Sequence, residues 1–398
     1  MAQATADTIA AGETLIVEAG TGTGKTFAYL MPALQSGKKV IISTGTRHLQ
    51  DQLFGKDLPV VRDALHAPVR AALLKGRANY LCWHRMGTAA SDGRQLSGRQ
   101  LHELEDIRSW SARTVSGDIA ELGALPEDSI IWPRVTSTVE NCLGQECEYF
   151  QDCFVVKARR LALEADIVVI NHHLLFADMV LKEEGFGELL PGADAFVIDE
   201  AHQLPEVASL FFGATLSSHQ LRDLIRDTRL EHVREAGDMQ DLPESADRLE
   251  AVTHQLRLAL GQADRRAAWQ EVSGDPALQE ALLKLSTCLQ QLTEWLVIAA
   301  ERGKGLESCR TRAVMLQERL ALLMKHSSSE YINGFETVRT SFRLNLTPLN
   351  VAPLLRYCME NLSSAWVFSS ATRAVGTSGD RFAEQLGLGG VRRVKLER

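Results

Sequence analysis

Long apolar runs are missing from this sequence of 398 residues. None reaches the roughly 18 consecutive residues that a membrane-spanning helix needs, and the N-terminus lacks the basic and then apolar segments of a signal peptide. There is no internal repeat and no low-complexity tract. With 45% hydrophobic and 24% charged residues, wholesale disorder, collagen and a coiled-coil rod are excluded. The sequence therefore predicts a cytoplasmic globular protein of about two or three domains, without a membrane partner.

An excess of positive charge is also absent. The chain has 43 Lys and Arg against 51 Asp and Glu, which gives a formal net charge of −8. This balance argues against indiscriminate binding to polyanions, but it leaves room for a local basic channel, because the field at a site depends on the residues around it. Seven cysteines, an odd number without an export signal, do not indicate a disulfide framework.

Short β-branched runs alternate with helical stretches along much of the chain. Each run ends in small or polar residues and suits a strand that is buried on both faces, as in a parallel sheet. The alternation predicts an α/β fold with a doubly wound parallel sheet. The predicted strands lie at 15–17, 40–42, 167–170, 196–198 and 366–368.

Two long intervals interrupt this alternation. Residues 76–154 contain clustered cysteines and few strand signals. Residues 206–343 show the apolar spacing of amphipathic helices, most clearly over 220–233, 246–260, 276–300 and 310–325. Both intervals are too long for loops in a compact domain, so we expect two inserted domains. The sheet domain is then divided into the parts 1–75, 155–205 and 344–398.

A strand, a glycine-rich turn and the start of a helix follow one another over residues 15–26. The pattern is that of a P-loop, except that Ala19 replaces its first glycine. In a P-loop, backbone N–H groups surround the phosphates, the lysine reaches the β- and γ-phosphates and the following hydroxyl binds Mg²⁺. The predicted ATP-binding residues are Gly20, Thr21, Gly22, Thr23, Gly24, Lys25 and Thr26, with Thr26 as a Mg²⁺ ligand.

Two carboxylates follow the buried run at 196–198. A charged side chain at the end of a buried strand is unfavourable unless it has a function. Beside a P-loop, Asp199 is expected to hold Mg²⁺ and Glu200 to orient or deprotonate the attacking water. The pair alone is weak support for an ATPase, but together with the P-loop it is strong.

These motifs resemble those of superfamily 2 helicases. Segments 18–26, 199–202 and 369–372 are similar to motifs I, II and III, and 43–50 is similar to motif Ia. The stretches 74–82 and 171–175 resemble the XPD-like iron–sulfur DNA helicases, and among them the DinG branch. The resemblance implies a RecA-like P-loop sheet with an iron–sulfur insert at 76–154 and a mostly α-helical arch insert at 206–343. It also implies that His202 acts with the motif III residues to couple ATP hydrolysis to strand movement, namely Ser369, Ser370, Ala371 and Thr372.

Four cysteines are candidates for metal ligands: Cys82, Cys142, Cys147 and Cys153. Such thiolates can hold zinc or an iron–sulfur cluster, or can be buried and free. The gaps between them are longer than those of common zinc knuckles, and the resemblance implies a [4Fe–4S] cluster on these four. His172 and His173 are adjacent and cannot point the same way on a strand, so we expect structural roles for them.

Basic residues flank the cysteines on both sides. Between residues 66 and 100 there are six Lys and Arg and one acidic residue, Asp92, and further basic residues follow Cys153. An ordinary solvated basic face is the plain interpretation. The basic residues could contact phosphates while a nearby aromatic ring stacks on a base, so the pattern favours a path for single-stranded DNA. The predicted contacts are Arg47, His48, Lys75, Arg77, Tyr80, Arg85, Lys157 and Arg160.

The resemblance implies an ATP-dependent 5′→3′ DNA helicase of repair and replication, with ATP, Mg²⁺ and a [4Fe–4S] cluster. It implies single-stranded or forked DNA as substrate, replication and repair proteins as partners, and a monomer. No counterpart of a second motor lobe follows residues 369–372, so we expect the first lobe with its inserts, with weak activity on its own. Two alternatives stay open at this point. One is a non-catalytic, cluster-containing module for single-stranded nucleic acid, and the other is an RNA-directed remodelling ATPase.

Overall fold

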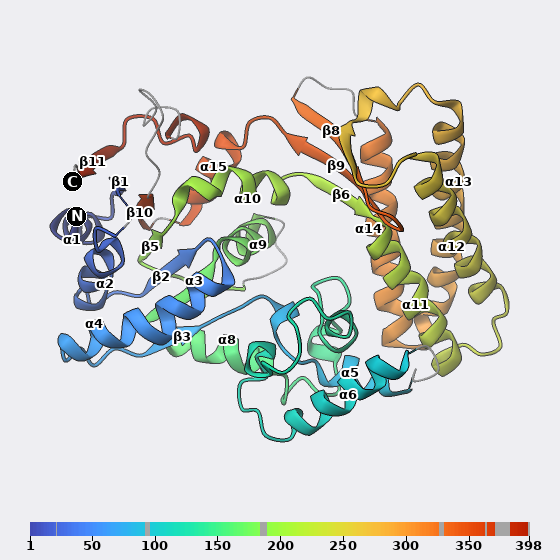
Figure 1. Ribbon diagram of the computed structural model, residues 1–398, viewed down its shortest axis with the longest axis horizontal. Helices are drawn as coiled ribbons and strands as arrows, with labels where there is room; N and C mark the ends of the chain where they lie inside the picture. The colour runs from blue at the N-terminus through green and yellow to red at the C-terminus, as the bar shows by residue number, and fades with distance from the viewer. Residues whose placement is uncertain are drawn as a thin grey trace.

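The computed structural model describes residues 1–20, 22–91, 96–183, 189–325, 330–362, 364–370 and 383–396. Three parts are visible in Figure 1: a sheet domain, an insert that contains α5 and α6, and a second insert that contains α11 to α14. Their bounds are α5 (Trp83–Ser91), α6 (Gly98–Ser111), α11 (Ser218–Glu235), α12 (Asp241–Ala259), α13 (Pro276–Ala299) and α14 (Lys304–Lys325). Within these ranges no helix is long and apolar enough to cross a membrane.

A seven-stranded sheet forms the sheet domain, and all neighbouring strands in it are parallel. The five strands that the sequence predicts are confirmed. β3 and β11 were not predicted, because one has three residues and the other is rich in charge. The spatial order is β11 (Arg392–Leu396), β1 (Thr14–Ala19), β10 (Ala365–Ser370), β5 (Ala195–Ile198), β2 (Val40–Thr44), β4 (Ile167–Asn171) and β3 (Ala71–Leu73).

Helices cover both faces of this sheet, so successive strand residues enter different cores. Leu15 and Val17 of β1 pack with α1 (Ala2–Ala11), α2 (Lys25–Gln35) and α4 (Leu58–Ala64). Ile16 belongs to the opposite core. That core contains side chains of α8 (Phe154–Glu164), α9 (His172–Glu183), α10 (Leu204–Phe211) and α15 (Ala352–Leu362). Burial on both faces explains why the central strands are apolar throughout, and it confirms the predicted doubly wound sheet.

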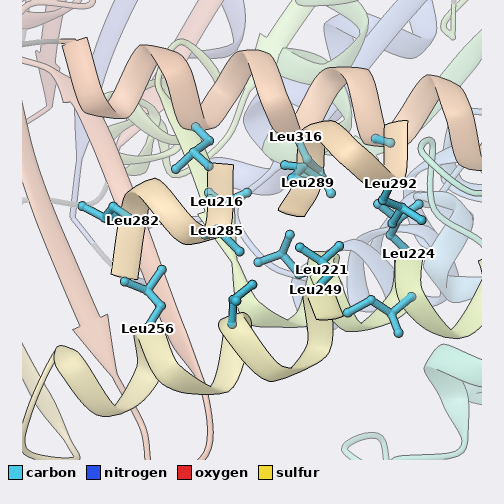
Figure 2. Close-up of a cluster of buried hydrophobic side chains, with 14 of the residues drawn as sticks. Leu216, Leu221, Leu224, Leu249, Leu256, Leu282, Leu285, Leu289, Leu292 and Leu316 are labelled. Atoms are coloured by element: carbon cyan, nitrogen blue, oxygen red, sulfur yellow. The ribbon is translucent and has the colours of Figure 1, made fainter. Parts of the chain in front are cut away.

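The second insert is built around leucines. Its four helices α11 to α14 agree with the predicted helical stretches, and their leucines meet in one core (Figure 2). The insert also contains an antiparallel sheet that was not predicted. Its strands follow the order β6 (Ala214–Ser217), β9 (Phe342–Pro348), β8 (Tyr331–Thr337) and β7 (Arg265–Ala268). Because β9 continues to Pro348, the observed unit extends past the predicted boundary at residue 343.

The first insert has a separate small core around Ile107, Ile131 and Trp132. Phe154 and Val155 of α8 join this core, so the predicted boundary at residue 154 falls inside the first turn of α8. The insert contains α7 (Trp132–Val135) and several short turns besides α5 and α6. Its loops hold the clustered cysteines, which are described below.

Candidate nucleotide and nucleic-acid sites

The P-loop connects β1 to α2 at the carboxyl edge of the sheet. Gly22 and Gly24 have φ angles of +75° and +79°, a left-handed backbone that favours glycine. The Thr23 hydroxyl donates a hydrogen bond to the Gly20 carbonyl at 2.8 Å. Since α2 begins at Lys25, its positive N-terminal end faces the loop. Thr21 lies outside the described residues.

The Lys25 ammonium is nearly buried, with 10% of the side chain exposed. Its Nζ lies 3.7 Å from Glu200 Oε1, and within the described chain it makes no hydrogen bond. A buried ammonium without a hydrogen-bond acceptor is unfavourable unless a ligand supplies one. A triphosphate has the required charge and oxygen atoms, so the residues present fit ATP.

The predicted motif II carboxylates lie immediately after β5, opposite the P-loop. The Asp199 N–H donates to the Ser43 carbonyl of β2 at 2.8 Å, and the Tyr29 hydroxyl donates to Asp199 Oδ2 at 3.3 Å. Burial, reinforced by neighbouring Glu200, raises the pKa of Asp199 to about 6, although Lys25 opposes this change. The buried carboxylate is therefore in need of a cation, which suits a Mg²⁺ ligand.

Glu200 has an unusual backbone for a residue with a side chain. Its φ is +51°, in the left-handed region, which costs on the order of 1–3 kcal/mol where surrounding structure holds it. Glu200 Oε2 also lies 3.3 Å from His202 Nδ1. The turn thus directs the Glu200 carboxylate toward both Lys25 and His202, the two neighbours that the proposed chemistry needs.

His202 connects motif II to motif III. Its Nδ1 is 3.3 Å from the Ser370 hydroxyl at the end of β10, a strand that pairs with β5. Ser369 is fully buried beside it in the strand. The structure therefore brings His202 and Ser370, two of the predicted coupling residues, into contact. Ala371 and Thr372 lie outside the described residues.

Two residues of this site were not predicted, Tyr29 and His172. His172 is fully buried, and its Nδ1 lies 2.7 Å from the Ser43 hydroxyl. Burial lowers the pKa of His172 to about 4, so its ring is neutral. His173 points elsewhere and lines a cavity, so the two adjacent side chains diverge. A structural role was expected for His172, but only the tertiary contacts place Tyr29 against Asp199 and His172 against Ser43.

The four predicted cysteine ligands are gathered in the first insert. All four are partly buried. Burial, with a further contribution from the other three thiols, raises the pKa of Cys82 to about 11. The Arg77 guanidinium donates to Cys142 Sγ at 3.1 Å and the Gly144 N–H at 3.4 Å. In the described part of the chain, however, no three His, Cys, Asp or Glu side chains are grouped as a single metal ion requires.

Three of the predicted DNA contacts are largely buried, although Lys75 also belongs to the lining of the cavity described next. Lys75 is buried, and its ammonium lies 2.7 Å from carboxylates of both Asp51 and Asp118. Tyr80 is also buried, and its hydroxyl accepts a hydrogen bond from the Lys75 N–H at 3.1 Å. Arg85 is buried and pairs with Asp227 at 2.9 Å. Lys75 and Arg85 lie in a stretch of the sequence that is rich in basic residues. Their carboxylate partners are distant in the sequence, so the sequence alone does not reveal these ion pairs.

A cavity of about 380 Å³ lies between the sheet domain and the first insert. Its described lining includes Arg47, Lys75, Arg77, Arg159 and His173, and none of the described lining residues is acidic. Burial and the nearby Arg77 lower the pKa of Arg159 to about 10. Arg159 was not among the predicted contacts. The concentration of guanidinium groups gives this cavity a positive potential that suits phosphate.

The other predicted contacts lie around this cavity without lining it. His48 lines a neighbouring cavity of about 340 Å³ together with Arg47. Lys157 and Arg160 project from α8, where Lys157 pairs with Asp152 at 3.5 Å and Arg160 donates to Gln151 at 3.2 Å. The interaction of these three residues with DNA stays a prediction.

A parallel sheet with a P-loop, a motif II turn and a contact between His202 and Ser370 is an arrangement typical of helicase-type P-loop ATPases. The family model for DEAD/DEAH box helicases matches residues 1–76. Over 388 residues the chain is 45% identical to "ATP-dependent DNA helicase YoaA" of Escherichia coli, and over 389 residues 43% identical to the YoaA of Haemophilus influenzae. Each match covers 98% of this chain and 61% of the relative, so the chain spans about three-fifths of the length of these relatives.

Two further comparisons agree. A DinG helicase of Mycobacterium tuberculosis is 37% identical over 243 residues, which are 56% of this chain and 36% of that protein. A solved structure described as truncated XPD covers 100% of this chain and 99% of its own, with a TM-score of 0.53 and 14% identity, which shows a shared fold. The resemblance to DinG/XPD-like helicases that the motifs indicated is thereby confirmed.

Proposed function

We propose that this chain is the ATP-binding and DNA-contacting part of an ATP-dependent DNA helicase. The observation that supports this most directly is the meeting of Lys25, Asp199 and Glu200 at the carboxyl edge of an XPD-like sheet. The similarity to proteins named ATP-dependent DNA helicases supports DNA as the substrate. Following the resemblance, we further propose 5′→3′ movement on single-stranded or forked DNA, as a monomer, in repair and replication.

The proposed chemistry assigns one role to each side chain of the nucleotide site. Lys25 exchanges its distant contact with Glu200 for the β- and γ-phosphates. Thr26 and Asp199 hold Mg²⁺, which neutralises charge on the phosphate oxygens when it is bound. Glu200, released from Lys25, orients or deprotonates the attacking water. His202 then transmits the changed position of Glu200 to Ser370 and the end of β10.

The basic cavity supports a path for the DNA backbone. Arg47 extends from the N-terminus of α3 (Arg47–Gln52), where the Thr46 side chain caps the helix by accepting from the Leu49 N–H. Arg77 faces the same cavity from the first insert, and Arg159 faces it from α8 of the sheet domain. Because guanidinium groups from two domains converge there, a strand bound at this place would contact the sheet domain and the insert at once.

We propose that Cys82, Cys142, Cys147 and Cys153 hold a [4Fe–4S] cluster. Each thiol of the cluster ligates a different iron, so the four sulfurs stand farther apart than around a single zinc ion, whose Zn–S bonds are only about 2.3 Å. The four thiols share one region of the first insert and raise one another's pKa, which supports a common ligand. The hydrogen bonds that Arg77 and the Gly144 N–H donate to Cys142 Sγ would stabilise a thiolate ligand there.

Replacing Lys25 tests the nucleotide site. In Lys25→Ala we expect the affinity for a fluorescent ATP analogue with Mg²⁺ to fall by about tenfold or more, because a charge-assisted phosphate contact is lost. Affinity for single-stranded DNA should stay within about twofold at fixed salt. Lys284→Ala is the matched control, because Lys284 lies on the helical insert and its ion-pair partner among the described residues is Glu280. Nucleotide binding that survives Lys25→Ala contradicts the proposal and favours a non-catalytic binding module.

A separate competition between DNA and RNA strands at fixed salt tests the substrate. A preference for RNA in that competition favours the remodelling ATPase.

Anaerobic purification with iron and sulfide quantitation tests the cluster. We expect about four iron atoms per chain in the wild type and loss of most of them in Cys147→Ser. Cys288→Ser should retain the iron, because Cys288 lies on α13 in the helical insert. A wild type that contains stoichiometric zinc and no iron would overturn the cluster assignment.

A further inference from the structure

Lys75 lies where the chain leaves the sheet domain and enters the first insert. Its side chain is buried, and its ammonium lies 2.7 Å from a carboxylate oxygen of Asp51 and 2.7 Å from one of Asp118. Burial by itself would lower the pKa of Lys75, but the hydrogen bonds to Asp118 and Asp51 outweigh it and raise the pKa, so the ammonium stays charged. Asp51 belongs to α3 of the sheet domain, and Asp118 belongs to the first insert. One buried cation therefore joins two domains.

The sheet-domain side of this contact fixes helix α3. The Gln50 side chain, next to Asp51, is fully buried and donates to the Leu74 carbonyl at 2.8 Å. Two neighbouring residues of α3 thus hold two neighbouring residues of the chain that enters the insert, Leu74 and Lys75. Arg47 is the first residue of the same helix, and it lines the basic cavity. The position and rotation of α3 against this chain therefore decide where the Arg47 guanidinium lies.

The insert side of the contact fixes the turn that carries Arg77. The Lys75 N–H donates to the Tyr80 hydroxyl at 3.1 Å, and Tyr80 forms an antiparallel bridge with Asp118. Asp118 is thus held by the backbone of Tyr80, while its carboxylate holds the Lys75 ammonium. The chain between Lys75 and Tyr80 is therefore closed at both ends. Arg77 lies within this turn and lines the same cavity as Arg47.

We propose that Lys75 is a positioning residue for DNA binding, which keeps Arg47 and Arg77 in one arrangement for the DNA backbone. The inference rests on the function proposed above and deepens it. The Lys75 ammonium already has two carboxylate partners, so it acts through them and does not bind a phosphate itself. Side chains that are held in place before binding lose little further freedom when the strand binds, which favours affinity. Loss of the contact should therefore weaken DNA binding without removing a phosphate contact.

The effect of removing an acidic residue separates this role from simple electrostatics by its sign. If Asp51 only adds negative charge near the strand, Asp51→Asn should strengthen DNA binding, because repulsion of the phosphates is reduced. If Asp51 holds Lys75, the same substitution should weaken binding, although the protein has become less acidic. We expect the affinity of the full chain for single-stranded DNA at fixed salt to fall by about threefold to tenfold in Asp51→Asn and in Asp118→Asn.

Asp63→Asn is the matched control, because Asp63 is an exposed carboxylate of α4 whose ion-pair partner among the described residues is Arg62. Its DNA affinity should stay at the wild-type level or increase slightly. Binding of a fluorescent ATP analogue with Mg²⁺ should stay within about twofold of the wild type in all three acidic variants, because the P-loop is not involved. Equal losses of nucleotide and DNA affinity would show general destabilisation and overturn the positioning role.

The salt dependence of DNA binding gives a second, independent measurement. A lysine that binds a phosphate contributes about one to the slope of the logarithm of affinity against the logarithm of salt concentration. Lys75→Met should lower the affinity and leave this slope at its wild-type value. A slope reduced by about one would show a direct phosphate contact and overturn the inference.

The acidic variants also decide the question by themselves, should Lys75→Met fail to fold. Unchanged or increased DNA affinity in either Asp51→Asn or Asp118→Asn would overturn the inference, and weakened binding in both supports it. Failure of the proposed function is distinguishable from failure of this inference. It appears in the wild-type background as DNA binding that Arg47→Ala and Arg77→Ala leave unchanged.

Discussion

At the scale of single residues, Asp199 shows how a functional position can oppose stability. Burial raises its pKa to about 6, above the ordinary carboxyl value of 3.8. The folded chain therefore binds a proton at Asp199 more tightly than the unfolded chain does. The sign follows directly: this contribution to stability is present below about pH 4 and is lost as pH rises through about 6. At neutral pH, without a cation, the ionised carboxylate weakens the fold.

Asp199→Asn should therefore stabilise the metal-free protein at neutral pH, by on the order of 1 kcal/mol, because the amide removes a buried charge and keeps an acceptor for Tyr29. The same substitution should abolish Mg²⁺-dependent nucleotide binding. Thermal melting at about pH 7 and about pH 4 measures the first effect, and the gain should disappear at the lower pH. An equal gain at both values would show that charge is not its cause.

At the scale of elements, the helical insert depends on close packing of leucines. Leu289 of α13 is fully buried in the core that α11 to α14 share, whereas Leu283 on the same helix is 59% exposed. The two side chains are chemically identical, so they provide a matched comparison of burial (Figure 2 labels Leu289).

Leu289→Ala should destabilise the insert by about 2–5 kcal/mol, because it removes apolar contacts and leaves a cavity. Leu283→Ala should change stability by less than about 1 kcal/mol. Hydrogen exchange followed on peptides of α11 to α14 reports the insert alone, without assuming that the whole chain unfolds in one step. Equal loss of protection in both variants would contradict the packing argument.

The same scale shows where sequence patterns stop being informative. The helices of the insert were predicted because apolar residues recur at helical spacing. The strands β8 and β9 were not predicted. They form an antiparallel pair in which alternate residues are buried, but each strand is short and contains polar residues, so this alternation is weak in the sequence. β3 has three residues and is held by pairing with β4, a contact that local propensity does not encode.

At the scale of the whole molecule, ion pairs join the two inserts. Asp227 of α11 lies 2.9 Å from Arg85 of α5 and 2.9 Å from Arg312 of α14, and all three are buried. Arg319 of α14 also pairs with Glu140 of the first insert at 2.8 Å. Burial by itself would raise the pKa of Asp227, but Arg85, Arg312 and Arg226 outweigh it and lower the pKa to about 2.

Asp227→Asn should loosen this junction by about 3–5 kcal/mol at neutral pH, because two buried guanidinium groups lose their shared carboxylate. Since the folded pKa is below the unfolded one, the stabilisation is present above about pH 4 and is lost as pH falls toward about 2, so the difference from wild type should shrink there. Thermal melting over this range and hydrogen exchange in α5 and α11 measure it. Glu280→Gln is the control, because its ion pair with Lys284 is exposed and should contribute little. A pH-independent difference would contradict the assignment.

Local chemistry in the sequence determined the nucleotide site, the parallel strands and the four cysteines, because a P-loop, a buried strand and a thiol spacing are recognisable over a few neighbouring residues. Only the tertiary structure decided which basic residues have a carboxylate partner. Lys75 and Arg85 resemble Arg47 and Arg77 in composition, yet the first two are neutralised by carboxylates that are distant in sequence or on another domain. The contact of His172 with Ser43 is likewise a product of the tertiary structure. Charge and burial depend on such long-range neighbours, and these exist only once the chain has folded.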